Sequence, residues 1–206
     1  MIRSLRFAAL IASVTATLSG CGALTALGQA SRPLEVYELS TPTIAAGGPR
    51  RNIELVVEEP IASGTLDVER IMIRPAPLQA QYLPDIRWAD TAPVMVQTLL
   101  VRSLAQTNRL SSVGRRPIGT VADFAVLSEL TAFQAETLDA TGTATVNVQL
   151  AMRLVRERDS RVVAARTFAT SEPALSNNAD DIVAAFDRAT SRMITESVSW
   201  VLENAR

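Results

Sequence analysis

The sequence contains no histidine and no lysine, and all 20 of its basic residues are arginine. Without histidine there is no Ser-His-Asp triad and no imidazole ligand for a metal ion. Without lysine there is no P-loop, whose lysine contacts nucleotide phosphates, and no Schiff-base nucleophile. Because the guanidinium of arginine stays protonated, carboxylates are the groups left for general acid–base catalysis. These absences exclude several large classes of enzyme and ATP-binding protein.

Cysteine occurs once, at Cys21, so the chain has no internal disulfide. Arg3 and Arg6 precede the uncharged apolar segment 7–18, which is shorter than the roughly 20 residues that cross a bilayer. The following Leu-Ser-Gly-Cys at 18–21 resembles the lipobox of bacterial lipoproteins, in which the cysteine is acylated and the leader is cleaved before it. We predict a signal peptide over residues 1–20 and palmitate-type lipidation of Cys21. The alternative is a secreted protein with an incidental cysteine.

The position after the cysteine favours one membrane over the other. An aspartate directly after the lipidated cysteine resembles an inner-membrane retention signal. This chain has Gly22 at that position, so we expect the protein to be anchored on the periplasmic face of the outer membrane. Each buried methylene contributes about 0.8 kcal/mol, and more than one acyl chain makes such an anchor stable. Residues 21–33 are predicted to be a flexible tether, and residues 34–206 one domain. The net charge of −1 and the lack of a basic stripe give no sign of nucleic-acid binding.

Periodicity predicts several strands and two helices. Apolar residues alternate with small polar ones most clearly over 143–155, which predicts an antiparallel strand with one buried face. Further strands are expected over 34–39, 52–60, 109–113, 123–133 and 162–170, with two short extended pieces within 70–83.

The first predicted helix covers 91–107, with Asp90 or Thr91 as N-cap and Asn108 as a left-handed stop. The second covers 179–204, with Asn178 as N-cap and two aspartates in its first turn. The order of strands, helix, strands, helix predicts a single α+β domain. We expect an antiparallel sheet with two main helices packed on one face.

Several stretches together resemble a known family. They are "VYELS", "IELVVEEP", "LDVERIMIRPAPLQAQYLPDIRWADTAPVMVQTLLVRSLAQTNRLSSV" and "ADFAVLSELTAFQAE", behind a lipobox. This combination is similar to the auxiliary lipoproteins of ABC-type transport systems, of the paraquat-inducible protein C type. The resemblance covers nearly all of the mature chain and is most specific over residues 66–100. One departure is "PAPLQA" before Tyr82, where family members often have a more polar stretch.

The resemblance implies a compact α+β domain and a set of partners. Such lipoproteins accompany an ABC permease, an ATPase and an MCE-domain protein that spans the periplasm, in systems similar to those that move phospholipid between two membranes. A homo-oligomer is possible, since a ring would suit a conduit. The family has no catalytic motif, so no enzymatic activity, cofactor or metal is expected.

Candidate partner-binding residues are Tyr82, Arg87 and Trp88, because tyrosine, tryptophan and arginine are favoured at interfaces. Packing at the entrance to the first helix is the alternative for the two aromatic residues. Arg70, Arg74 and Arg87 are candidates for contacts with lipid phosphates or acidic partner residues; the alternative is that they are solvated or make modest surface pairs.

Two acidic pairs and one strand face also leave alternatives. Asp180 and Asp181 suit a helix start or, less simply, a metal site, and Glu58–Glu59 is a strand-end pair or a catalytic dyad. The polar face of 143–155 is solvated or abuts a neighbouring subunit.

Three functions remain open from the sequence. The first is a non-catalytic accessory subunit of an ABC/MCE-type lipid transport system. The second is a structural or assembly lipoprotein of another envelope machine, such as one that inserts lipopolysaccharide. The third is a hydrolase that uses carboxylates alone, which requires two acids in one cleft about 5 to 10 Å apart.

Overall fold

The structure, a computed structural model, describes residues 34–45, 47–116, 121–136 and 142–206. Cys21, the predicted leader and the predicted tether lie outside these residues. Val36–Arg206 forms one unit, and the fold is that of this unit.

Three long strands form the main part of the sheet: β8 (Phe124–Glu136), β9 (Thr145–Arg156) and β10 (Arg161–Pro173). β9 pairs antiparallel with both neighbours along its whole length. Its apolar positions are buried and its polar positions are more exposed, in strict alternation up to Leu154. The one-side-buried strand predicted over 143–155 is therefore confirmed.

Strands β2 (Arg51–Val57), β3 (Ile61–Ala62), β4 (Met72–Arg74) and β7 (Leu110–Gly114) run parallel to β8, which corrects the prediction of an antiparallel sheet. β2 lies between β8 and β7 and runs parallel to both. The chain reaches β7 from β2 through helix α3 (Ala92–Gln106), and a helical crossover is the usual connection between parallel neighbours. The sheet is thus mixed, within the α+β class that the sequence predicts.

Short strands complete the structure. They are β1 (Glu35–Tyr37), β3 (Ile61–Ala62), β4 (Met72–Arg74), β5 (Gln81–Tyr82) and β6 (Ile86–Trp88). β3 and β4 run parallel to β8, β5 pairs antiparallel with β4, and β1 pairs with β6 in a separate two-stranded sheet.

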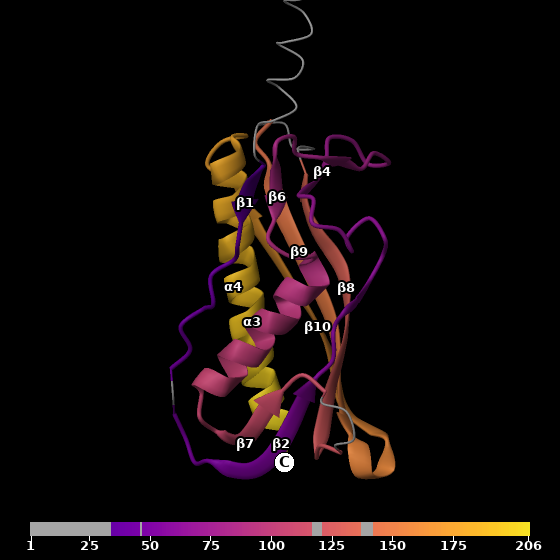
Figure 1. Ribbon diagram of the computed structural model, residues 1–206, viewed down its shortest axis with the longest axis vertical. Coiled ribbons are helices and arrows are strands. Elements are labelled where there is room, and N and C mark those ends of the chain that lie inside the picture. The colour runs from indigo at the N-terminus through magenta and orange to yellow at the C-terminus, as the bar shows by residue number, and fades with distance from the viewer. Residues whose placement is uncertain (1–33, 46, 117–120, 137–141) are drawn as a thin grey trace, which may run out of the picture. The chain divides into compact units, whose positions relative to one another are not determined.

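Both predicted helices are present and cover the same face of the sheet (Figure 1). α3 begins after Thr91, has Pro93 in its first turn, and is followed by Asn108 at φ 53°, the left-handed stop that the sequence predicts. α4 (Ala179–Asn204) has the predicted bounds. Its length of 26 residues lets it lie along β9 and β10, while α3 crosses it towards β2 and β7.

An aromatic cluster joins the sheet to the helices. Trp88, Phe133 and Phe186 come from β6, β8 and α4, with ring centroids 4.9 to 5.9 Å apart. At the far end of α4, the ring of Trp200 lies 5.8 Å from that of Phe168 on β10. Tilted and edge-on contacts at these distances stabilise a core beyond the area they bury.

The C-terminal end of α4 is capped from a distant strand. Local side chains satisfy two carbonyl groups there: Asn204 donates to Trp200 at 2.8 Å, and Arg206 donates to Glu203 at 2.7 Å. Arg51 of β2 donates from Nη1 to the carbonyl oxygens of Leu202, at 2.7 Å, and Ala205, at 2.8 Å. This contact fixes the C-terminal end of the helix beside β2.

We predict that Arg51→Ala lowers the free energy of unfolding by about 1.5–3 kcal/mol, the usual range for hydrogen bonds to a charged group. Urea denaturation followed by circular dichroism measures the change. Arg161→Ala, at the exposed start of β10, is the matched control and should change the value by less than about 0.5 kcal/mol. Equal effects of the two substitutions would contradict the capping role.

A second arginine joins three segments at the end of the sheet where β8 begins. The guanidinium of Arg116 contacts Glu58 after β2, with Nε and Oε1 2.5 Å apart, and also Glu157 in the turn between β9 and β10. Glu157 accepts a further hydrogen bond from the backbone N–H of Ala122 at 2.9 Å. The hydrogen bond from Arg116 holds the pKa of Glu157 below its ordinary value.

A carboxylate whose pKa is lower in the folded chain stabilises the fold above its unfolded pKa, and this contribution is lost as pH falls through the folded pKa. We therefore predict that Glu157→Gln is less stable than the parent near neutral pH. The difference should shrink through the acid range below 4.5. Urea midpoints across this range test the prediction, with Glu203→Gln on α4 as the control. A difference that stays constant down to a pH well below the folded pKa would contradict it.

Candidate functional site

The structure separates the three predicted partner-binding residues. Trp88 ends β6 with 1% of its surface exposed and contacts Phe133 and Phe186. This burial supports the alternative interpretation, packing at the entrance to α3. The ring is enclosed by the core, so Trp88 presents almost no surface to a partner.

Tyr82 and Arg87 remain accessible and belong to one contiguous surface. The guanidinium of Arg70 lies over the ring of Tyr82, 4.6 Å from its centroid. The adjacent Glu69 accepts from Arg87, with Oε2 and Nη1 2.6 Å apart. We call Glu69, Arg70, Tyr82 and Arg87 the Tyr82 patch.

The Tyr82 patch combines an aromatic ring with two guanidinium groups and one carboxylate. Glu69 offsets the charge of Arg87, so Arg70 leaves the patch with one excess positive charge. Tyrosine and arginine together are typical of the residues that dominate binding energy at protein interfaces. The patch therefore suits a protein partner with an acidic group opposite Arg70.

Sequence reasoning did not single out Glu69 as the partner of Arg87. The segment between β3 and β4 that contains Glu69 and Arg70 is irregular, so no hydrophobic period places its side chains. Arg74, the other arginine predicted from the sequence, lies half-buried at the end of β4 and outside the patch.

The face of the sheet opposite the helices is a second candidate surface. Small or polar side chains of β8, β9 and β10 line its shallow hollows: Ala132, Gln134, Asn147, Gln149, Ala151, Ala165, Thr167 and Ala169. Near β3, Ile61 and Leu127 border a hollow of about 220 Å³ that is also lined by the charged residues Glu58, Glu59, Glu129 and Arg153. This is the polar strand face that the sequence predicts to be solvated or to abut a neighbour, and the structure leaves both interpretations open.

β10 adds an edge to this surface. It is the outer strand in the order β10-β9-β8-β2-β7, and its 13 residues pair with β9 on one side. An outer strand of this length offers backbone groups to another strand, while bulges such as the one between Val162 and Ala164 limit such pairing.

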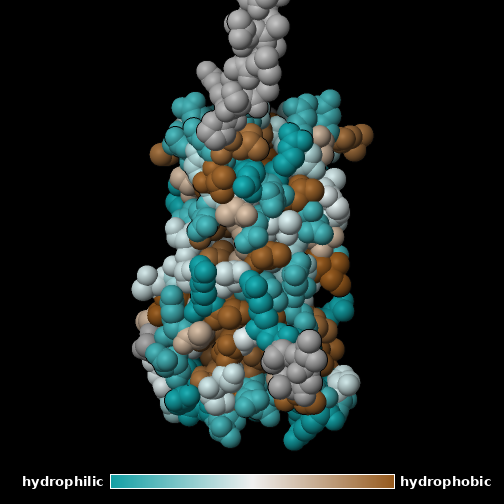
Figure 2. Space-filling view, viewed as in Figure 1, coloured by the Kyte–Doolittle hydropathy of each residue, from teal (hydrophilic) through white to brown (hydrophobic). Residues whose placement is uncertain are grey.

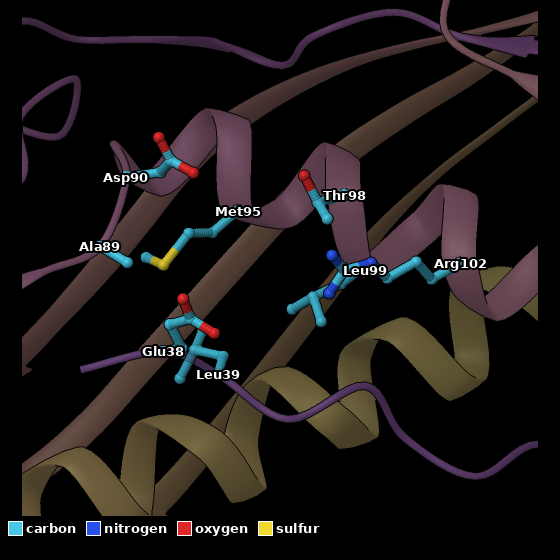
Figure 3. A pocket seen from close by; sticks show the side chains of 8 residues that line it. All are labelled: Glu38, Leu39, Ala89, Asp90, Met95, Thr98, Leu99 and Arg102. Carbon is cyan, nitrogen blue, oxygen red and sulfur yellow. The ribbon is translucent and has the colours of Figure 1, made fainter.

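A hollow between α3 and the segment after β1 is too small to suggest a ligand. The side chains of Met95 and Leu99 point from α3 towards Leu39, with Glu38 and Arg102 at the rim (Figure 3). Its volume is about 80 Å³, whereas small-molecule sites begin at about 300 Å³. The hollow is a junction between two elements, with no room for a lipid.

Three of the four acidic side chains in the pairs that the sequence offered make local contacts. Asp180 accepts from the Tyr37 hydroxyl at 2.6 Å and Asp181 from the Ser176 hydroxyl at 2.6 Å, both at the start of α4. Glu58 is paired with Arg116. Across the described residues, no three acidic, histidine or cysteine side chains are grouped to hold a metal ion. These contacts support the helix-start and strand-end interpretations.

Residues 37–196 match the sequence profile of a family described as the ABC-type transport auxiliary lipoprotein component. The chain belongs to this family. The match spans β1 to most of α4, so the whole arrangement described above is the family domain. This confirms the resemblance inferred from the sequence, and the family is one of transport components.

Individual relatives agree with this assignment. An uncharacterized protein of Bradyrhizobium diazoefficiens is 28% identical over 192 residues, covering 90% of this chain and 49% of that protein, so this chain spans about half of that relative. A crystal structure from Xanthomonas campestris, of the DUF330 family, superposes with a TM-score of 0.74 at 27% identity, covering 82% of this chain and 95% of that one. A Chlamydia trachomatis hypothetical protein at 10% identity, with a TM-score of 0.52 over 74% of this chain and 98% of that one, shares the fold alone.

No helix in the described part of the auxiliary lipoprotein is both long and apolar enough to cross a membrane.

We predict that Trp88→Ala lowers the free energy of unfolding by about 3–5 kcal/mol, because it leaves a cavity beside Phe133 and Phe186. Tyr82→Ala removes a half-buried ring and should cost less than half as much. Chemical denaturation of both variants gives the comparison. A Trp88 variant as stable as the parent would show that the ring is not part of the core in solution.

Proposed function

We propose that this auxiliary lipoprotein is a non-catalytic accessory subunit of an ABC/MCE-type system that moves lipid between two membranes. In this proposal acyl chains on Cys21 hold the domain on the periplasmic face of the outer membrane. Family membership over residues 37–196 carries the proposal. The lipobox that ends at Cys21 supports the anchor.

The residue types present indicate which steps of transport this subunit performs and which are left to its partners. A chain without lysine has no P-loop, so ATP is bound and hydrolysed by the separate ATPase. The 80 Å³ hollow beside α3 is too small for a phospholipid. A hollow of about 530 Å³ near the start of β8 is lined largely by polar and charged side chains, among them Glu54, Asp123 and Arg156, rather than by an apolar surface for acyl chains. Both features favour a role in docking over a role as a lipid carrier. The domain therefore contributes surfaces to the transport path.

The Tyr82 patch is the docking surface that we assign to the periplasmic MCE-domain protein. Its ring and guanidinium groups are accessible, and they lie in the stretch over which the sequence most resembles the family. The helix-free face and the edge of β10 are the surfaces that we assign to a further copy of the chain in a ring.

Affinity purification of the full chain from gently solubilised membranes, with mass spectrometry of the recovered proteins, tests this function. We expect an MCE-domain protein with its permease and ATPase. Arg70→Glu combined with Tyr82→Ala should remain in the membrane fraction but recover at least about tenfold less MCE-domain protein, the effect of losing roughly 1.4 kcal/mol. Arg158→Glu, exposed in the turn between β9 and β10 and outside both assigned surfaces, is the matched control.

Cys21→Ser tests the lipid anchor independently of the docking surface. This variant should move to the soluble periplasmic fraction and impair transport, while its purified domain keeps the Tyr82 patch. Full transport by Cys21→Ser would remove the anchor from the proposal. Recovery of outer-membrane barrel or lipopolysaccharide machinery by the parent chain would favour the assembly alternative.

A further inference from the structure

Two apolar loop tips project from the same end of the unit. Leu78, in the loop between β4 and β5, is 100% exposed, and Leu175, in the loop between β10 and α4, is 82% exposed. Apolar side chains as large and as exposed as these two stay in contact with water until another surface covers them.

Strand registers show that these two loops leave the sheet at the same end. Arg74, the last residue of β4, pairs with Glu136 at the end of β8. Glu136 pairs with Thr145, and Thr145 pairs with Pro173, the last residue of β10. Both loops therefore leave the sheet at its β8 C-terminal end, and the β4–β5 loop projects there with apolar side chains (Figures 1 and 2).

Neither loop contains a charged residue. The loop 75–80 reads PAPLQA and the loop 174–178 reads ALSNN. In the first, the backbone N–H of Gln79 donates to the carbonyl of Ala76 at 3.0 Å, which closes a turn with Leu78 near its tip. An uncharged tip with an outward leucine suits the boundary between lipid headgroups and acyl chains.

The folded unit also begins at this end. Tyr37 donates its hydroxyl to Asp180 at the start of α4, directly after the second loop. Val36, the first residue of the unit, is half exposed beside it. The chain that leads back to Cys21 therefore joins the unit where the two leucines project. From Cys21 to Val36 it can reach about 50 Å when fully extended, so it can hold this end at a membrane surface.

We propose that Leu78 and Leu175 insert into the lipid surface of the membrane that holds Cys21. This inference rests on the lipid anchor of the proposed function. The anchor supplies a high effective concentration of lipid at this end, so two weakly inserting side chains are enough to orient the domain. The sheet then stands with its opposite end, where β8 begins, away from the bilayer and towards the periplasm.

An exposed apolar residue at the opposite end of the sheet serves as the matched control. Val121 is 76% exposed and lies just before Phe124, which pairs with Arg156 at the far end of β9. It is an apolar side chain of similar exposure that the proposal places away from lipid.

The test uses single-cysteine variants of the full lipidated chain: Leu78→Cys, Leu175→Cys and Val121→Cys. Acylation of Cys21 leaves the introduced thiol as the one that reacts with an environment-sensitive fluorophore. Labelled proteins are reconstituted in vesicles of phosphatidylethanolamine and phosphatidylglycerol. We expect blue-shifted emission at positions 78 and 175, quenching there by lipid-borne spin labels, and several-fold weaker quenching by aqueous iodide than at position 121.

The outcomes distinguish the inference from the anchor on which it rests. If all three labels are equally open to iodide while the protein floats with the vesicles, the anchor stands and the insertion of the two tips is overturned. If the parent chain has a reactive thiol and does not float, the anchor fails and the inference fails with it.

Discussion

The packing of Trp88 against Phe133 and Phe186 is the interaction on which the rest of the structure depends. It joins β6, β8 and α4, three elements from distant parts of the chain. Because Trp88 is held in the core, the chain on either side of it has fixed positions: the Tyr82 patch precedes it and α3 follows it. The exposed surface near β5 and β6 therefore owes its shape to a residue that does not itself reach the surface.

Two arginines make the tertiary contacts that hold the opposite end of the sheet together. Arg51 ties the end of α4 to β2, and Arg116 ties the segment after β7 to both β2 and the β9–β10 turn. These charged side chains form hydrogen bonds and ion pairs at the end of the sheet that contains the short strands β2 and β7. A chain without disulfides within the domain holds its ends by such contacts and by packing.

Family membership and the surfaces described here fit one physical picture. The protein has a covered face, on which both helices pack, and an open face of small and polar side chains. The open face and the accessible Tyr82 patch are the two surfaces that the proposed docking role uses. The uncharged loops at one end and the charged β9–β10 turn at the other give the unit a direction along the sheet.

The sequence by itself determined the α+β class, both helices and the long strand β9, because these rest on local periodicity and on local signals such as Pro93 and Asn108. It also determined the family, through stretches that span the domain. Only the tertiary structure decided that β2 runs parallel to β8, that Trp88 is buried and that Glu69 pairs with Arg87. Each of these depends on contacts between segments far apart in the chain or in irregular conformation, where no period of 2 or 3.6 residues assigns a side chain to a face.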